Sequence, residues 1–452
     1  MAKYKAYSEY KDSGVEWLGE IPAHWNIKRL GQFFEERREK VSDKDYPALS
    51  VTMQGIIPQL DTAAKTEAGD NRKLVLKDDF VINSRSDRKG SAGVSRFNGS
   101  VSLISIVMRP MGINPRFAHY LLRCRPFQEE FYRYGKGIVA DLWSTNSSEL
   151  KNIHLPEIQF SESEKITIFL DHETAKIDNL IEKQHQLIEL LKEKRHAVIS
   201  HVVTKGLNPD VPMKDSGVEW VGEMPSYWRI SKLRYMFNFG KGLTITKENL
   251  QDEGIPCISY GEVHSKYGFE VSPKLHSLKC VDEKYLKDNS GSLLSKGDII
   301  FADTSEDIDG SGNFSQLITD DIVFAGYHTI IAKPFNRKNW RFYAYLLDCK
   351  ELRTQVRHAV KGVKVFSITQ AILRGLSIWL PTDDEQENIA KFLDQETTKI
   401  DNLLKKQQQI IQLLQERRTA LISAAVTGKI DVRNWVAPGE QAKAESPAEA
   451  FA

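Results

Sequence analysis

Two segments of this chain each occur twice, in the same order. KDSGVEWLGEIP begins at Lys11 and returns from Lys214 as KDSGVEWVGEMP, with two positions changed. A longer segment that opens with FLDHETAKIDNL and ends at Gly206 is echoed from Phe392 to Lys429. The chain is therefore one unit of roughly two hundred residues in duplicate, in the order A–B–A–B. We expect a protein with pseudo-two-fold internal symmetry, whose ligand also has two halves.

Each B segment has the periodicity of a long amphipathic helix. Apolar residues recur at steps of three and four over about forty residues, without glycine or proline. Such a helix is roughly 60 Å long, which is longer than an ordinary helix within a domain, and it shows no second apolar face. The complementary stripe is that of the other copy, so we predict an antiparallel coiled coil, although each helix packed on its own domain is an alternative. The predicted pairing residues are Ile177, Ile181, Ile188, Leu191, Ile400, Leu404, Ile411 and Leu414.

The two A segments share a layout and differ in sequence. Each has short β-rich pieces separated by turn residues, followed by a helical piece, where RFAHYLLRC (116–124) matches RFYAYLLDC (341–349). We predict an α+β fold, in which two similar mixed α/β domains are separated and joined by the two long helices. The predicted boundaries are 1–160 and 206–383 for the domains with the linker, 161–205 and 384–436 for the helical spacers, and 437–452 for a disordered tail.

Composition excludes several classes of protein. The net charge of +1 shows no overall basic excess, so an anionic partner must be met by local patches. The cysteines have no CxxC spacing, which disfavours a zinc ribbon or a redox motif, and we predict buried core thiols at Cys124, Cys257, Cys280 and Cys349. The sequence has no secretory h-region and no apolar run long enough to span a bilayer. We therefore expect a cytoplasmic protein that makes no contact with a membrane.

Searches for catalytic motifs are negative. The chain has no Walker A, HExxH or GxSxG pattern, and no GxGxxG after a predicted strand. NPRF at 114–117 is one residue from the NPPF box of adenine methyltransferases, but no glycine-rich cofactor loop accompanies it, which favours a turn. We therefore expect no catalytic residue, metal site or cofactor in this chain.

The repeated KDSGVEW segment could suggest a metal site, because it carries Asp12 and Glu16 in its first copy. No histidine or further acid joins these carboxylates at a fixed spacing in both copies. We interpret the segment as a turn that caps a short helix, with Trp17 and Trp25 as core anchors.

Basic residues cluster locally in both A segments. The segment from Lys77 to Lys136 contains eleven Lys or Arg residues and five acidic residues. The segment from Lys333 to Lys364 contains nine Lys or Arg residues and two acidic residues. Both clusters are interleaved with Gly, Ser and aromatic residues, as suits contacts to phosphates and base edges. Their equivalent places in the repeat favour binding over the ordinary alternative of a solvated basic face. The candidate DNA-binding residues are Arg85, Arg88, Lys89 and Arg96 in the first domain, and Lys241, Lys361 and Lys364 in the second.

The opening KDSGVEWLGEIPAHW, the FLDxETxKIDNL helix start and the A–B–A–B order resemble the specificity subunit of type I restriction–modification systems. The resemblance covers essentially the whole chain up to Pro438. It implies that each A segment is a target-recognition domain that reads one half of an asymmetric, bipartite site on double-stranded DNA. It also implies that the helical spacers dock two methyltransferase subunits, which carry S-adenosylmethionine and methylate adenine. A separate restriction and translocase subunit would then cleave unmodified DNA.

Two other functions stay open at this point: a stand-alone nuclease or methyltransferase with an unrecognised site, and a protein-only scaffold. The repeat order makes one further prediction. The N-terminal segment and the segment after the first helix lead into the same motif, so the end of the second helix, near Gly428, should lie close to the start of the chain.

Overall fold

The computed structural model describes residues 4–59, 69–137, 143–360, 362 and 365–436. The chain divides into two compact units. Unit 1 comprises Met1–His185 and Gln408–Ala452, and unit 2 comprises Gln186–Gln407. Each unit thus contains one A segment and part of each B segment. The tail that we expected to be disordered, 437–452, lies outside the described residues.

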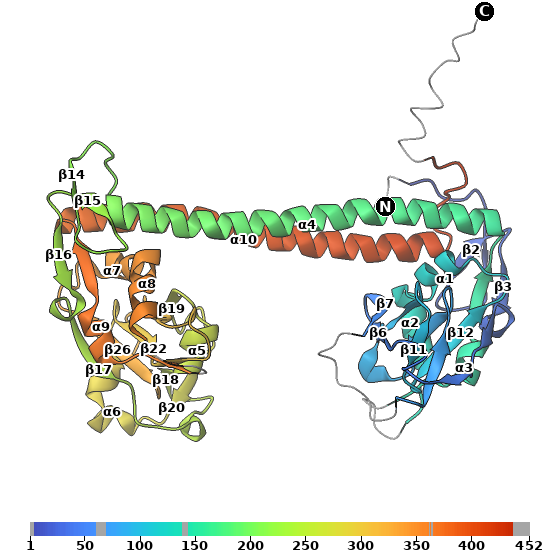
Figure 1. Cartoon of the computed structure of the whole chain (residues 1–452), viewed down its shortest axis with the longest axis horizontal. Coiled ribbons are helices and arrows are strands. Elements are labelled where there is room, and N and C mark those ends of the chain that lie inside the picture. The colour runs from blue at the N-terminus through green and yellow to red at the C-terminus, as the bar shows by residue number, and fades with distance from the viewer. Residues whose placement is uncertain (1–3, 60–68, 138–142, 361, 363–364, 437–452) are drawn as a thin grey trace, which may run out of the picture. The chain divides into compact units, whose positions relative to one another are not determined.

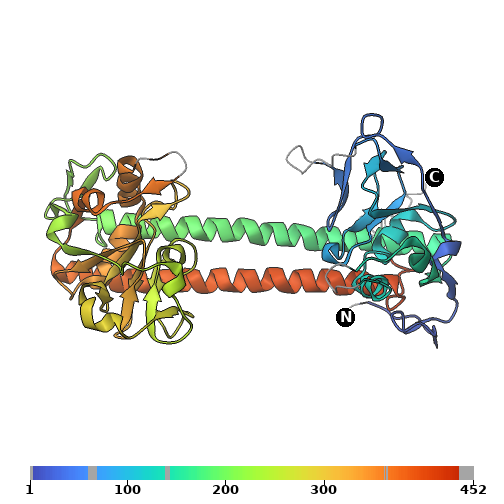
Figure 2. The ribbon, with the colours of Figure 1, turned by 90° about the horizontal axis from the view of Figure 1, so that it is seen from below.

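The two long helices are α4 (Phe160–Lys205) and α10 (Asp383–Val426). In unit 1 the first part of α4 lies beside the last part of α10, and in unit 2 the remaining parts lie side by side, antiparallel in both cases (Figure 1, Figure 2). Helix α4 ends before Gly206, whose φ of 78° is left-handed. Helix α10 ends at Val426, short of residue 436 that we expected, because a left-handed Gly428 follows with a φ of 75°.

The facing sides of the helices are apolar, as the periodicity predicts. In unit 1, Ile177 shares a core with Leu421 and Ala425. In unit 2, Ile199 shares a core with Ile389. All the predicted pairing residues are buried or partly buried: Ile177, Ile181, Ile188, Leu191, Ile400, Leu404, Ile411 and Leu414. The prediction of an antiparallel helical pair is confirmed.

An ion pair at equivalent positions joins the two helices in each unit. Arg418 Nε lies 2.8 Å from Asp178 Oδ1 in unit 1. Arg195 Nε lies 3.2 Å from Asp401 Oδ1 in unit 2. These equivalent contacts show that the duplicated helices pair in the same register in the two units.

The A segment of unit 1 is built on a four-stranded antiparallel sheet of order β10-β9-β12-β4. Its strands are β4 (Phe34–Glu36), β9 (Phe80–Asn83), β10 (Ala92–Val94) and β12 (Ser105–Pro110). Smaller sheets are formed by β5 (Lys40–Val41), β8 (Arg72–Val75) and β11 (Gly99–Val101), and by β6 (Leu49–Thr52) and β7 (Gly55–Pro58). The helices are α1 (Pro115–Leu121), α2 (Arg125–Arg133) and α3 (Ser147–Asn152).

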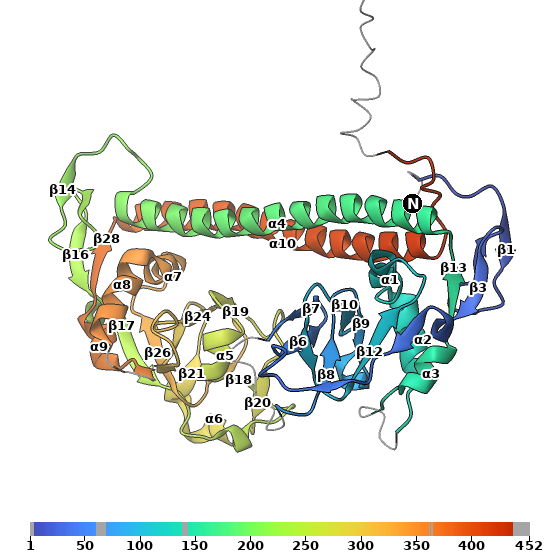
Figure 3. The same cartoon turned by 45° about the vertical axis from the view of Figure 1, so that its right-hand side comes forward.

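Unit 2 repeats this plan with one more strand, in the order β17-β26-β22-β24-β19. These strands are β17 (Phe237–Lys241), β19 (Glu270–Val271), β22 (Ile299–Ala302), β24 (Phe314–Leu317) and β26 (Thr329–Pro334). A second sheet contains β18 (Ile255–Ile258), β20 (Lys279–Val281), β21 (Leu293–Leu294) and β25 (Val323–Ala325). The principal helices are α7 (Trp340–Asp348), α8 (Lys350–Ala359) and α9 (Gln370–Gly375). In each unit a helix, α1 or α7, lies between the main sheet and the long helices (Figure 3).

A two-stranded ladder closes each A segment. In unit 1, β3 (Asn26–Arg29) pairs with β13 (His154–Glu157). In unit 2, β16 (Arg229–Lys232) pairs with β28 (Ser377–Leu380). The divergent residues of each A segment therefore enter and leave through adjacent strands.

The KDSGVEW segment forms a hairpin, so our prediction of a turn capping a short helix is wrong. Strand β1 (Tyr10–Asp12) pairs with β2 (Glu20–Pro22), and β14 (Met213–Asp215) pairs with β15 (Glu223–Pro225). Asp12 Oδ1 accepts a hydrogen bond from Gly14 N at 3.0 Å, and Gly14 has a φ of 66°. This aspartate stabilises a left-handed turn rather than a helix start.

Each hairpin leads into a tryptophan that reaches the first turn of a long helix. Trp25 is fully buried, and its Nε1 donates to Glu162 Oε1 of α4 at 3.1 Å. The equivalent Trp228 donates to Glu385 Oε2 of α10 at 3.0 Å. Trp25 is therefore a core anchor, as expected, whereas Trp17 is partly buried at the edge of the same core. Each copy of the repeated motif therefore leads to a tryptophan that anchors the start of one long helix.

Candidate nucleic-acid interface

Three of the predicted DNA-binding residues lie together between β9 and β10. Arg85, Arg88 and Lys89 are all exposed, around a short 3-10 turn at Ser86–Arg88. Ser86 N donates to Trp143 O at 2.8 Å, so the adjacent segment positions this loop. The Arg88 side chain is 69% exposed and its nearest carboxylate among the described residues, Asp87, is 3.9 Å away. With Asp87 as its one acid, this loop presents a net positive charge to solvent.

Arg96 belongs to a different surface. It follows β10, whereas Arg85, Arg88 and Lys89 precede it, so the strand separates them. Arg96 is exposed and lines a cavity beside α1 and the long helices instead. The SRSDRKGSAGVSR stretch therefore does not form one continuous basic patch.

In unit 2 the structure describes one of the predicted residues. Lys241 is exposed at the end of β17 and lines a cavity of about 630 Å³ with Tyr327, His328 and Gln370. Lys361 and Lys364 lie outside the described residues.

The basic loop between β9 and β10 has no basic counterpart in unit 2, so this part of the first cluster is unmatched, contrary to our expectation of two patches in equivalent places. When the two sheet orders are aligned, the β22–β24 connection of unit 2 is the equivalent of the β9–β10 connection of unit 1. That connection in unit 2 is acidic, with Asp303, Glu306, Asp307 and Asp309. Several arginines of the second cluster are also neutralised internally. The pairs are Arg337 with Asp298, Arg341 with Asp394, and Arg353 with Asp348.

The NPRF segment begins a helix. Asn114 Oδ1 accepts hydrogen bonds from Arg116 N at 2.9 Å and Phe117 N at 3.3 Å, which caps α1. NPRF is therefore the start of a helix rather than the turn that we expected, because Asn114 caps α1 from Pro115 onwards. No group of three or more His, Cys, Asp or Glu residues placed to hold a metal ion is found among the described residues.

All four cysteines are buried and unpaired, as predicted. Burial raises the pKa of Cys124 and of Cys257 to about 12. These thiols stay protonated at neutral pH and have the character of core residues rather than nucleophiles.

The long helices expose a second set of apolar side chains, which contradicts our expectation of a single apolar face. In unit 1, Leu180 and Leu413 are 46% and 63% exposed. In unit 2, the equivalent Leu403 and Leu190 are 42% and 61% exposed. Large apolar side chains exposed at equivalent positions in both units suit a protein-binding face. The sequence signal was present, because Leu180, Leu187 and Leu190 extend the stripe beyond the width that one partner helix covers.

Comparisons with known proteins agree on one family. Residues 225–413 match the family model described as the type I restriction modification DNA specificity domain. The specificity subunit of the type I restriction enzyme MjaVIII of Methanocaldococcus jannaschii is 22% identical, over 92% of this chain and 95% of that protein. A putative MjaX specificity subunit of the same organism is also 22% identical, over 92% and 96%.

Solved structures show the same fold. A chain from a study of complex assembly and conformational transition of the type I R-M system matches with a TM-score of 0.68 and 14% identity, over 91% of this chain and 99% of that one. The HsdS subunit of Thermoanaerobacter tengcongensis matches with a TM-score of 0.51 and 14% identity, over 91% and 98%. No helix in the described part of the chain is long and apolar enough to cross a membrane. With its duplicated domains and paired helices, the chain is similar in sequence and in fold to type I restriction–modification specificity subunits.

Proposed function

We propose that this chain reads a bipartite, asymmetric site on double-stranded DNA, with one half-site for each A segment. The observation that carries the proposal is the contrast between a shared frame and different loops. The contacts from Trp25 to Glu162 and from Trp228 to Glu385 are equivalent. The loops that leave the two main sheets at equivalent places carry opposite charge. Domains with the same frame and different surfaces suit two different base sequences.

The loop at Arg85, Arg88 and Lys89 is the best supported DNA contact in unit 1. Its side chains are exposed, and the ion pair that Arg88 forms with Asp87 is long, at 3.9 Å. Basic side chains of this kind bind phosphates and fix the position of a protein on DNA. Lys241 and the undescribed Lys361 and Lys364 remain the candidates in unit 2.

The exposed leucines on the long helices support docking of methyltransferase subunits. Each unit carries such a set at equivalent positions, which include Leu180 in unit 1 and Leu403 in unit 2. Two similar apolar faces suit two copies of one partner. S-adenosylmethionine and adenine methylation would belong to that partner, and a restriction and translocase subunit would join the assembly.

The length of the helices suits a spacer function. Helix α4 has 46 residues. At about 1.5 Å per residue such a helix is roughly 69 Å long, which exceeds one turn of DNA at about 34–36 Å. We therefore expect the length of the paired helices to set the number of unread base pairs between the half-sites.

Mapping methylated adenines in genomes with and without this chain, with the methyltransferase present in both, tests the proposal. We expect two blocks of specified bases separated by a gap, and loss of methylation at that motif without the chain. Turnover of DNA by the purified chain alone, given metal ion and methyl donor, would support the enzyme alternative instead. A complex with the methyltransferase that fails to bind DNA would support the scaffold alternative.

A further inference from the structure

A cavity of about 390 Å³ lies in unit 1 beside α1, α4 and α10. Its charged lining comprises Arg96, Arg123, Arg125, Asp171, Asp178 and Arg418. The acids are already neutralised, because Asp171 pairs with Arg116 and Asp178 pairs with Arg418. The cavity therefore carries an excess of positive charge.

Arg96 and Arg123 carry that excess. Neither guanidinium forms an ion pair with a described carboxylate. Arg123 Nη2 donates to Met53 O at 2.7 Å, while its buried Nε has no hydrogen-bond partner among the described residues. Burial and the charge of Arg418 lower the pKa of Arg123, so its positive charge is poorly compensated.

The contacts of His119 show that the site is short of acceptors. Val94 N lies 3.2 Å from His119 Nδ1, and Arg123 Nη1 lies 2.6 Å from Nε2. Burial, then Arg123 and other nearby arginines, lower the pKa of His119 to about 3, so its ring is neutral. A neutral imidazole has one acceptor nitrogen, yet two N–H donors face this ring. One of these two donors, Val94 N or Arg123 Nη1, therefore lacks an acceptor.

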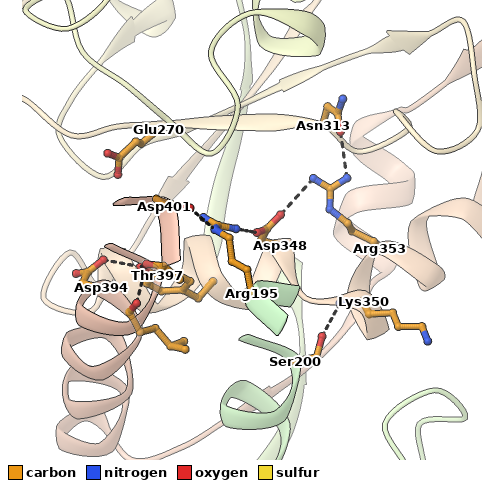
Figure 4. A network of polar contacts seen from close by, with 12 residues as sticks. Arg195, Ser200, Glu270, Asn313, Asp348, Lys350, Arg353, Asp394, Thr397 and Asp401 are labelled. Carbon is orange, nitrogen blue, oxygen red and sulfur yellow. Dashed lines mark hydrogen bonds and ion pairs between the residues drawn. The ribbon is translucent and has the colours of Figure 1, made fainter. Parts of the chain in front are cut away.

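The equivalent site in unit 2 supplies the missing acceptor within the chain. The match of RFAHYLLRC with RFYAYLLDC places Asp348 where unit 1 has Arg123. Asp348 lies 3.5 Å from Arg195 and 3.3 Å from Arg353, in a connected network (Figure 4). Arg195 is itself the equivalent of Arg418. The second copy thus neutralises its arginines with a carboxylate, whereas the first copy has an arginine in its place.

We propose that the cavity in unit 1 binds a phosphate group, held by Arg96 and Arg123 beside the Arg418–Asp178 ion pair. These two guanidiniums come from the turn after β10 and from the turn that follows α1, so they can donate to different oxygens of one tetrahedral anion. Forked guanidinium donors fit phosphate oxygens well. The phosphate would take the place that the Asp348 carboxylate holds in unit 2. Its source would be either the DNA backbone or a free phosphate ion.

Thermal unfolding of the full chain in inorganic phosphate and in chloride, at equal ionic strength and pH, tests this proposal. We expect phosphate to raise the Tm by roughly 2–4 °C at concentrations well above its Kd. Arg123→Asp, which installs the residue type of unit 2, should abolish that shift. Arg229→Asp makes the same charge change at an exposed position on unit 2 and should retain it.

Arg96→Ala provides a second variant, because this exposed side chain makes no described ion pair and its loss should not disturb the core. It should reduce the shift even if Arg123→Asp does not fold. The proposal is wrong if phosphate gives the wild-type chain no greater shift than chloride, or if Arg96→Ala retains the full shift. Because the probe is inorganic phosphate, this result does not depend on the proposed function.

Binding of duplex DNA then identifies the source of the phosphate. If the DNA backbone is the source, Arg96→Ala should weaken binding to all sequences and reduce the slope of log K against log salt by about 1. If a free ion is the source, DNA affinity should stay unchanged while the thermal shift is lost. If phosphate has no effect and Arg123→Asp weakens only methyltransferase binding, an acidic side chain of the partner occupies the cavity and the proposal is wrong.

Discussion

The hydroxyl of Tyr10 donates a hydrogen bond to the carbonyl oxygen of Gly428 at 3.1 Å, which joins the first strand of the chain to the end of its last helix. Beside it, Asp431 N donates to Lys5 O at 2.8 Å. These contacts confirm that the end of the second helix lies close to the start of the chain. Each compact unit is therefore completed by a helix end from the other half of the sequence.

The indole of Trp25 should stabilise unit 1 through its hydrogen bond to Glu162. Glu162 is 6% exposed and also contacts Tyr7 and His24, so the substitution removes one of three hydrogen bonds to a buried carboxylate. Trp25→Phe should lower the free energy of unfolding by about 1–3 kcal/mol, measured by urea denaturation. Trp17→Phe is the matched control, because Trp17 Nε1 has no hydrogen-bond partner among the described residues. Equal costs for the two substitutions would show that lost packing, not this hydrogen bond, explains the effect.

Two neighbouring residues of α4 should separate helix pairing from partner docking. Ile177 is 4% exposed and Leu180 is 46% exposed. Ile177→Ala should lower the free energy of unfolding by about 2–4 kcal/mol, because it leaves a cavity in the core. Leu180→Lys should leave the urea midpoint nearly unchanged and weaken binding of the methyltransferase subunit in a pull-down assay. Normal methyltransferase binding by Leu180→Lys would remove Leu180 from the docking face.

Arg88 should contribute to DNA affinity without determining sequence preference. Arg88→Ala should weaken binding several-fold and reduce the slope of log K against log salt by about 1, measured by fluorescence anisotropy of the complex with its methyltransferase. Arg109→Ala serves as the control, because Arg109 lies on β12 and faces Glu35 at 3.6 Å. An unchanged salt slope for Arg88→Ala would exclude this loop from the DNA interface.

His119 should make stability fall in mild acid. Burial and neighbouring arginines lower its pKa from 6.5 to about 3. The unfolded chain therefore binds a proton near pH 6.5 that the folded chain does not bind, and stability declines as the pH falls from about 6.5 towards 3. Between pH 8 and pH 5 the wild-type chain should lose about 2 kcal/mol more than His119→Ala, measured by urea denaturation. Equal losses would mean that His119 titrates normally.

Local patterns in the sequence predicted the helices well. The spacing of Ile177, Ile188, Ile400 and Ile411 fixes the paired faces, because burial on a helix follows the 3.6-residue period. The hairpin was missed because an aspartate before a glycine can begin either a helix or a turn. Asp12 uses the same side-chain oxygen that would have capped a helix.

Charges were harder to predict, because their partners are distant in sequence. Arg337 and Arg341 appeared in a basic cluster, yet they pair with Asp298 and Asp394 in the folded unit. The partner Asp394 lies on a different helix and beyond the cluster that we counted. The difference between Asp348 in unit 2 and Arg123 in unit 1 could be interpreted only from the structure, which places Arg418 and Arg123 in the lining of one cavity.

Each A segment should read its own half-site, independently of the other A segment. The paired backbone contacts from Leu30 N to Ile153 O and from Leu233 N to Leu376 O mark equivalent junctions. A hybrid chain in which 233–376 also replaces 30–153 should carry the same recognition domain twice. Adenine methylation mapped across a genome should then follow an inverted repeat of one wild-type half-site. Methylation that still follows the asymmetric wild-type motif, in a hybrid that folds and binds methyltransferase, would show that the A segments do not read separate half-sites.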